Sequence, residues 1–179
     1  MNDFFELIAR RESCRDYDPA RPVEKEKLTA MVEAARLSPS ACNSQPWKYY
    51  VVTNQAVVKA LRPLLSVGGM NPFVKNCPCF AVVTELPSGI RSRPGSDASV
   101  QRFAPVDVGL SVAHFVLAAT EMGLGTCIIG ALKQARTMEL LSIPETERIR
   151  VAVAIGYPAT DSLRVKKRKP LEDIAAFID

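Results

Sequence analysis

The chain contains little of what most self-contained catalytic sites are built from. Its 179 residues include one histidine, His114, which argues against a histidine triad or a histidine-rich metal centre. No G-x-G-x-x-G follows a candidate strand and no G-x-x-x-x-G-K-S/T occurs, so neither common nucleotide-binding loop is present. We expect His114 to be a core residue with a satisfied hydrogen bond. If the protein is an enzyme, its reactive centre should come from a cofactor.

Long apolar runs are missing as well. The longest apolar stretches are interrupted well before the ~18 residues that suggest a membrane span, and residues 1–6 show no signal-peptide pattern. The five cysteines are odd in number and their spacings form no disulfide framework. Cys77 and Cys79 are the one close pair, and no further ligands complete a metal site around them. We therefore expect a cytoplasmic protein with no metal and no membrane contact.

The amino-acid composition is that of an ordinary globular chain. Apolar residues make up 47% and charged residues 23%, close to average usage, and the length predicts a single domain over residues 1–179. The net charge of +4 is unevenly spread, and its densest part is the run Lys166–Lys169. This run has no interleaved aromatic residues. Such a run is most often a solvated face and sometimes a nucleic-acid or phosphate patch, and one phosphate group would suffice to explain it.

Hydrophobic spacing predicts helices and strands in irregular alternation, which favours an α+β layer fold. Helix 106–122 is apolar almost all round, which suggests that a second subunit covers one of its faces. Residues 85–104 show little periodicity and should form a functional or mobile loop. The predicted helices are 3–11, 24–37, 55–65, 106–122, 132–142 and 171–178, and the predicted strands are 47–53, 80–84 and 150–156.

Three segments carry candidate chemistry. Arg10–Arg15 (R-R-E-S-C-R) offers guanidinium and hydroxyl donors for phosphate oxygens, although arginines at helix ends are also common for dipole reasons. Ser38–Trp47 (S-P-S-A-C-N-S-Q-P-W) combines two fixing prolines with several donors and acceptors, or simply joins a helix to a strand. Gly123–Gly130 (G-L-G-T-C-I-I-G) lets backbone amides approach a ligand, or merely reverses the chain.

Together with K-x-R-x-P-L-E near the C-terminus, these segments resemble the motifs of the FMN-dependent nitroreductase family. They read R-x-S-x-R, S-P-S-x-x-N-x-Q-P-W and G-L-G-T-C-x-I-G in the family's order, and the four motifs span residues 11–172. The resemblance implies a three-layer α-β-α fold with a mixed central sheet in an interlocked homodimer, with FMN at each subunit boundary. It also implies NADH or NADPH as hydride donor, nitroaromatic or quinone-type acceptors, and a ping-pong cycle.

The resemblance also implies where the cofactor is held. Arg11 and Ser13 would lie near the FMN phosphate and ribityl chain, with Lys166 and Arg168 at the same phosphate. Arg15 would lie by the pyrimidine edge near N1 and O2, where a cation stabilises the reduced flavin. No side-chain acid or base is required, so the chemistry is borne by the flavin.

The remaining contacts would come from three other places. Residues 39–43 would cover part of the ring system from the partner subunit, and Asn71 would approach the pyrimidine end. Backbone amides around Ile129 and Gly130 would point at flavin N5 and O4. The full predicted set is Arg11, Glu12, Ser13, Arg15, Pro39, Ser40, Ala41, Asn43, Asn71, Cys127, Ile129, Gly130, Lys166 and Arg168.

Some residues depart from the family pattern. Glu12 stands where the family often has a basic or polar residue, and its charge is expected to weaken the local phosphate field. Ala41 replaces a frequent serine, and Ile128 replaces a frequent tryptophan. The alternatives are a flavin-binding store or sensor with little turnover, a flavin-fragmenting or dehalogenating relative, and a nucleic-acid-binding module that uses the basic run.

Overall fold

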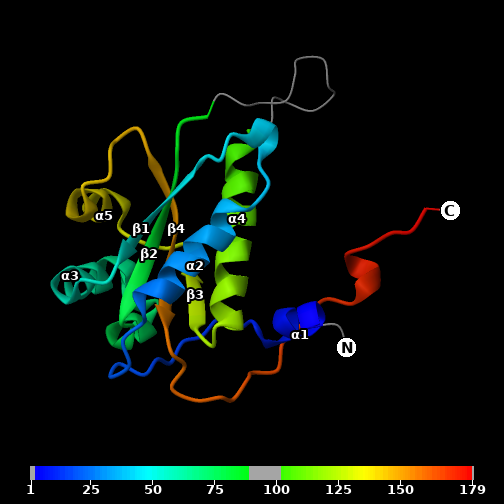
Figure 1. Cartoon of the computed structure of the whole chain (residues 1–179), viewed down its shortest axis with the longest axis horizontal. Helices are drawn as coiled ribbons and strands as arrows, with labels where there is room; N and C mark the ends of the chain where they lie inside the picture. Colours follow the sequence, from blue (N-terminus) through cyan, green and yellow to red (C-terminus); the bar gives the residue numbers. More distant parts are fainter. Residues whose placement is uncertain (1–2, 89–101, 179) are drawn as a thin grey trace.

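Four antiparallel strands form one sheet in the computed structural model, which describes residues 3–88 and 102–178. The strand order is β1-β2-β4-β3, so that β1 and β3 are the outer strands (Figure 1). The strands are β1 Trp47–Val52, β2 Cys79–Glu85, β3 Gly125–Ile129 and β4 Arg148–Gly156.

The sheet differs in two ways from the expectation. Strand β3 was not predicted, because the surrounding glycines indicated a turn, whereas the β-branched residues Thr126, Ile128 and Ile129 form a strand between them. The three strand pairs are all antiparallel, so the expected mixed sheet is corrected for the described residues. Between described residues, the one parallel pairing is the isolated bridge between Ser13 and Thr126.

Five α-helices accompany the sheet in the described residues. The predicted helix bounds are confirmed to within two residues for all five, and exactly for α3, where the Asn54 side chain accepts hydrogen bonds from two backbone amides. The predicted final helix 171–178 is wrong, because only the single turn Leu171–Asp173 forms. The helices are α1 Asp3–Arg10, α2 Lys25–Arg36, α3 Gln55–Leu65, α4 Ala104–Glu121 and α5 Gln134–Leu141.

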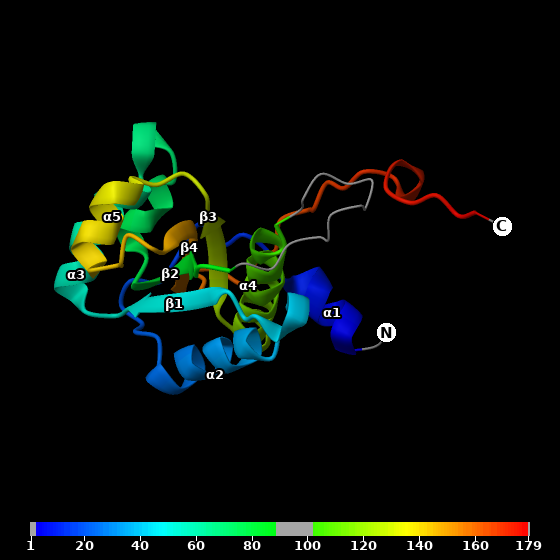
Figure 2. The same ribbon diagram turned by 90° about the horizontal axis from the view of Figure 1, so that it is seen from above.

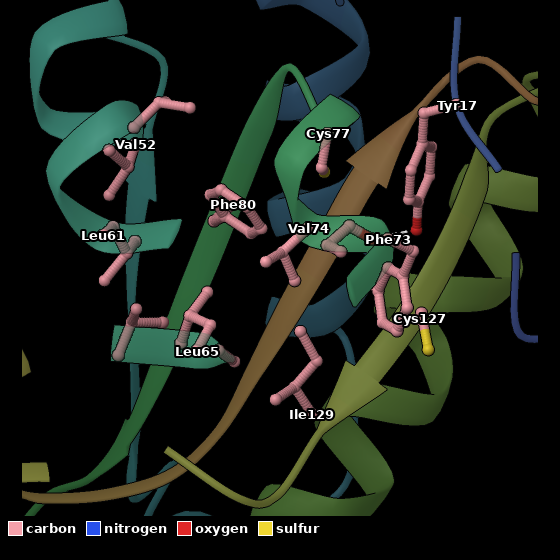
Figure 3. Packing of buried hydrophobic residues seen from close by; sticks show 14 of the residues in the cluster. Tyr17, Val52, Leu61, Leu65, Phe73, Val74, Cys77, Phe80, Cys127 and Ile129 are labelled. Carbon is pink, nitrogen blue, oxygen red and sulfur yellow. Dashed lines mark hydrogen bonds between the residues drawn. The ribbon is translucent and has the colours of Figure 1, made fainter. Parts of the chain in front are cut away.

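Helices cover both faces of the sheet, which confirms the three-layer α+β fold (Figure 2). Side chains alternate across β2: Phe80 and Val82 are buried on the side of α3 and α5, and Ala81 and Val83 on the side of α2 and α4. The first of these two clusters includes Leu61 of α3 (Figure 3). Full burial of one such large apolar side chain contributes about 1.5–3 kcal/mol.

Helix α4 is not buried on all sides within one chain. The sheet and α2 cover residues such as Phe115, but Val106 is 51% exposed and Leu110 is 42% exposed. His114 lies on the same exposed stripe, and its Nδ1 is 3.1 Å from the carbonyl oxygen of Leu110. The expectation of a core histidine is therefore corrected for the single chain, although its ring does have a hydrogen-bond partner.

The two ends of the chain lie apart from this core. Residues after Pro158 leave the sheet, and the last segment extends away from the body (Figures 1 and 2). Without packing partners a short segment gains too little to remain helical, which explains the missing final helix. The predicted loop 85–104 lies mostly outside the described residues. No helix in 3–88 or 102–178 is long and apolar enough to cross a membrane.

Candidate functional site

The first candidate segment runs from the end of α1 along the outer strand β3. Ser13 bridges Thr126, and the backbone amide of Cys14 donates to the Thr126 carbonyl at 2.9 Å. Gly125 permits this approach, because a Cβ at that position would lie 2.7 Å from the Cys14 side chain. The sheet therefore fixes the backbone from which Arg11, Ser13 and Arg15 project.

The basic C-terminal run meets this segment across a cavity of about 260 Å³. The structure thus brings together the cations that the sequence predicted from opposite ends of the chain. Desolvation, then the charges of Arg11 and Arg168, lower the pKa of Lys166 below its usual value, and Glu12 opposes the shift. Such crowding of like charges favours a bound anion. The lining residues are Arg11, Glu12, Ser13, Arg15, Arg164, Val165, Lys166, Lys167 and Arg168.

A second cavity of about 470 Å³ shares Arg15 with the first. Asn71 lines it in the left-handed conformation, with φ 58°, and its Nδ2 donates to the Leu65 carbonyl at 3.0 Å. This bond occupies one amide proton and leaves the Asn71 side-chain oxygen as an acceptor. Lys75 adds a further cation to the lining. The predicted residues Arg15 and Asn71 therefore lie on one cavity, next to the cationic one.

The free edge of β3 supplies backbone donors near these cavities. Because backbone polar groups alternate in direction along a strand, the edge that Thr126 presents to Cys14 also carries the amide of Ile128. The side chain of Ile129 is 2% exposed and belongs to the core, whereas Gly130 is exposed. This alternation favours the amides of Ile128 and Gly130 over that of Ile129 as ligand donors.

The second candidate segment lies at the opposite end of α4 (Figure 1). The backbone amide of Ala41 donates to Asp107 Oδ2 at 3.2 Å near the start of α4, whereas Arg10 pairs with Glu121 at 3.1 Å at its end. At about 1.5 Å per helical residue, Asp107 and Glu121 are about 21 Å apart. Within one chain, the structure does not bring residues 39–43 to the cavities.

This distant loop has a tightly specified backbone. Cys42, Asn43 and Gln45 have φ angles of 52°, 53° and 44°, a region that is costly for residues other than glycine and that clusters at functional sites. The Ser40 hydroxyl accepts a hydrogen bond from the Gln45 amide at 2.9 Å, and Asn43 Oδ1 accepts from Gln45 Nε2 at 3.1 Å. The loop is therefore held in one shape before any ligand or partner covers it.

The cysteines near the site are free thiols. Burial raises the pKa of Cys14 and of Cys127, so both thiols stay protonated near neutral pH. Burial likewise raises the pKa of Cys79 to about 12. These cysteines serve as small buried side chains, and Cys127 lies 4% exposed inside β3. Within the described parts of the chain, no three His, Cys, Asp or Glu side chains could together hold a metal ion.

Three cations of the site are absent from the predicted set. Arg164 and Lys167 line the first cavity and Lys75 the second. The spacing of Arg164, Lys166 and Arg168 could have indicated Arg164, since alternate residues of an extended segment share a side. A mainly apolar cavity of about 430 Å³ between α2 and β1 contains none of the predicted site residues.

The residues present fit an elongated ligand with a phosphate at one end. Arginine, lysine and serine donors line the first cavity and suit phosphate oxygens. The second cavity offers a cation from Arg15 and an acceptor oxygen from Asn71, which suit a heterocycle with both acceptor and donor atoms on its edge. Both requirements are those of FMN.

Comparison with known proteins agrees with this donor set. A family model described as the nitroreductase family matches residues 8–68 and 64–157. The chain belongs to the nitroreductase family. The resemblance seen in the sequence motifs is thereby confirmed, as is the expectation of an oxidoreductase family.

Several known proteins resemble this chain over most of its length. A protein of Archaeoglobus fulgidus, provisionally named an NADH dehydrogenase/NAD(P)H nitroreductase, is 31% identical over 162 residues, 88% of this chain and 87% of the relative. An iodotyrosine deiodinase of Nematostella vectensis is 23% identical over 197 residues, 96% and 74% of the two chains. A crystal structure described as an oxidoreductase containing FMN has a TM-score of 0.78 at 25% identity, covering 95% and 89%.

Proposed function

We propose that this nitroreductase-family protein binds FMN and passes hydride from NADH or NADPH to a small-molecule acceptor. One observation carries the proposal: a cavity in which the cations of residues 11–15 meet those of 164–168, joined through Arg15 to a second cavity of larger size. The family membership and the relative named for NAD(P)H nitroreductase support the same reading.

The chain's own residues bind and orient the cofactor. Bound FMN supplies the hydride-transfer centre, which explains why the chain needs no histidine cluster. Arg11, Lys166 and Arg168 would neutralise the phosphate, to which the Ser13 hydroxyl would donate a hydrogen bond. Arg15 would place positive charge at the pyrimidine end, where it would favour the reduced state. The free edge of β3 offers backbone donors to the ring.

The proposed active form is a homodimer, because one chain holds only half of the site. Residues 39–43 lie at the other end of α4 from the cavities, so a second copy has to supply them. The exposed stripe with Val106 and Leu110 on α4 is a suitable contact surface. The C-terminal segment also exposes apolar side chains that a partner would cover, namely Leu171, Ile174, Phe177 and Ile178.

We propose nitroaromatic and quinone-type acceptors that replace the oxidised dinucleotide in a ping-pong cycle, with the whole chain acting as one cytoplasmic domain. The free thiols are compatible with a reducing compartment. Initial rates at several donor and acceptor concentrations test the cycle. Parallel double-reciprocal lines are expected, and intersecting lines would contradict a shared site.

The visible absorbance spectrum of the purified protein tests the central proposal. We expect flavin bands, directly or after addition of FMN, that bleach when NADH or NADPH is added without oxygen. Bands that do not bleach would contradict hydride transfer and favour a flavin store or sensor. A protein that takes up no FMN would contradict the whole proposal. Reoxidation by halogenated aromatics rather than by nitroaromatics or quinones would assign the chain to the deiodinase-like branch.

A further inference from the structure

The cations at the C-terminal side of the phosphate cavity lie on a segment without regular secondary structure. Residues 159–170 contain no helix or strand, so side-chain contacts must fix the position of Lys166 and Arg168. In the described part of the chain, the side-chain hydrogen bonds that tie residues 160–169 to the body involve two residues. Arg164 bonds to Glu12 and Ser13, and Lys166 donates to the carbonyl of Ala9.

Glu12 holds Arg164 by both its main chain and its side chain. Glu12 Oε2 accepts a hydrogen bond from the backbone amide of Arg164 at 3.2 Å and lies 3.4 Å from its Nε. The Arg164 guanidinium also donates to the Ser13 carbonyl. The Glu12 side chain is only 19% exposed, whereas that of Arg164 is 58% exposed, so water screens the carboxylate less than it screens the guanidinium.

This double contact restrains the cations that follow. Lys166 and Arg168 come two and four residues after Arg164, within ~7 Å and ~14 Å even of fully extended chain. A residue fixed in both position and direction therefore limits where these two side chains can reach. Without the contact, the segment would lose more conformational entropy when it binds a phosphate.

The carboxylate of Glu12 is otherwise difficult to reconcile with its location. It lines the same cavity as the cations, and a fixed negative charge there repels a dianionic phosphate. Simple electrostatics therefore predicts that removal of this charge tightens phosphate binding. A role in holding Arg164 predicts instead that removal of this charge weakens phosphate binding.

We propose that Glu12 is a positioning residue, whose pairing with Arg164 holds Lys166 and Arg168 at the phosphate-binding cavity. This Glu12–Arg164 clamp makes a residue that looked unfavourable from the sequence a contributor to cofactor affinity. The inference rests on the proposed binding of FMN.

Dissociation constants for FMN and for riboflavin, measured on the full chain, test the clamp. Glu12→Gln is expected to weaken FMN binding by roughly 3- to 10-fold. Riboflavin lacks the phosphate, so its affinity should not change. The matched control is Asp161→Asn, which removes an exposed negative charge from the same segment; this aspartate has no ion pair within the described residues. Its FMN affinity should stay equal or increase slightly.

A mutant cycle tests the partner. Arg164→Ala should weaken FMN binding, and Glu12→Gln should add little in the Arg164→Ala background, because the contact is already lost. The reversed pair E12R/R164E should recover part of the affinity that E12R alone loses. Amide hydrogen exchange of residues 160–169 in flavin-free Glu12→Gln should be faster than in the parent protein.

The outcomes separate the clamp from the proposed function. A parent protein that binds neither FMN nor riboflavin contradicts the proposed function. If the parent binds FMN but Glu12→Gln binds it equally or more tightly, the clamp is wrong while the function stands. Equal losses for FMN and riboflavin would also overturn the clamp, because they would reveal a general effect of Glu12 on the fold.

Discussion

Two regions of the molecule differ in how far their side chains are buried and paired. The first is the sheet with its covering helices, and the second is the two terminal segments. In the first region, even a buried charge has its partners: Glu147 is 8% exposed and accepts hydrogen bonds from Thr84, Tyr50 and Lys48. In the terminal segments, apolar side chains such as Phe177 are 82% exposed, and six cations line one cavity together with the single carboxylate of Glu12.

This difference separates a region that packs mainly on itself from a region that leaves cations and apolar side chains uncovered. The first region provides most of its own packing and hydrogen-bond partners, although Ser44 Oγ and Arg62 Nε are buried without one among the described residues. Its role is to fix the positions of β3 and α4. The terminal segments carry the cations and apolar residues that the proposed cofactor and second subunit would cover. The candidate site lies along the border, where Ser13 bridges Thr126 at the edge of the sheet.

The largest expected effect is on stability, and it contrasts two phenylalanines. Phe115 is fully buried on α4, with its ring centroid 4.9 Å from that of Tyr49. Phe115→Ala should lower the free energy of unfolding by about 3–5 kcal/mol. Phe177→Ala should change it by less than about 0.5 kcal/mol at low protein concentration. Urea unfolding measures both, and similar losses would show that the C-terminal segment is packed within the chain.

The next effect concerns the candidate site, which lies between these two regions. Arg11→Ala removes a charge-assisted hydrogen bond to phosphate and should weaken FMN binding by about 1.5–3 kcal/mol. Its unfolding free energy should change little, because Arg11 is not buried. Arg136→Ala on α5, an exposed arginine paired with Glu139, is the control and should bind FMN normally. Unchanged FMN affinity of Arg11→Ala would show that the phosphate binds elsewhere.

A buried charge in the first region should give a pH-dependent effect of similar size. Burial alone would raise the pKa of Glu147, but its three hydrogen-bond donors outweigh burial and hold the pKa below its usual value. The stability that this carboxylate contributes is thus present above the ordinary carboxylate pKa and is lost as the pH falls through the lowered one.

Glu147→Gln should therefore cost about 1.5–3 kcal/mol near neutral pH. The difference from the parent protein should shrink as the solution becomes acidic. Urea unfolding at several pH values measures it. A difference that stays constant down to strongly acidic pH would mean that packing, and not charge, sets the effect.

The smallest effect concerns the crowded cations. Desolvation and neighbouring positive charges lower the pKa of Lys166, so this lysine loses its proton at a lower pH than an exposed lysine does. FMN affinity should fall by about 0.2–1 kcal/mol as the pH rises through that pKa. Lys166→Arg should remove the dependence, because arginine stays protonated. The same alkaline loss in Lys166→Arg would assign the titration to another group.

Local patterns predicted most elements and failed where local and tertiary effects compete. The bounds of α3 were predicted exactly, because Asn54 caps a clearly periodic segment. Strand β3 was missed because Gly123 and Gly125 indicated a turn, and only pairing with β4 makes the segment a strand. The final helix was predicted from spacing alone, but its apolar side chains Leu171, Ile174 and Phe177 are exposed and gain no burial from the helix.

The site was predicted through its motifs more than through chemistry. Arg11, Ser13 and Lys166 were predicted to lie at one phosphate, and they line one cavity although they come from opposite ends of the sequence. That this cavity binds the FMN phosphate stays a prediction. Glu12 was interpreted as a weakness of the phosphate site, because its partner Arg164 could not be identified without the fold. The positions of residues 39–43 relative to the cofactor stay a prediction.

The sequence by itself determined the family, the types of most elements and the chemistry of the donors, because motifs, periodicity and side-chain charge are local properties. Only the tertiary structure decided that Glu12 meets Arg164, 152 residues away, and that residues 39–43 lie a helix length from the cavities. Such distances follow from how helices pack on a sheet. Packing energies depend on many residues at once, so no local pattern contains them.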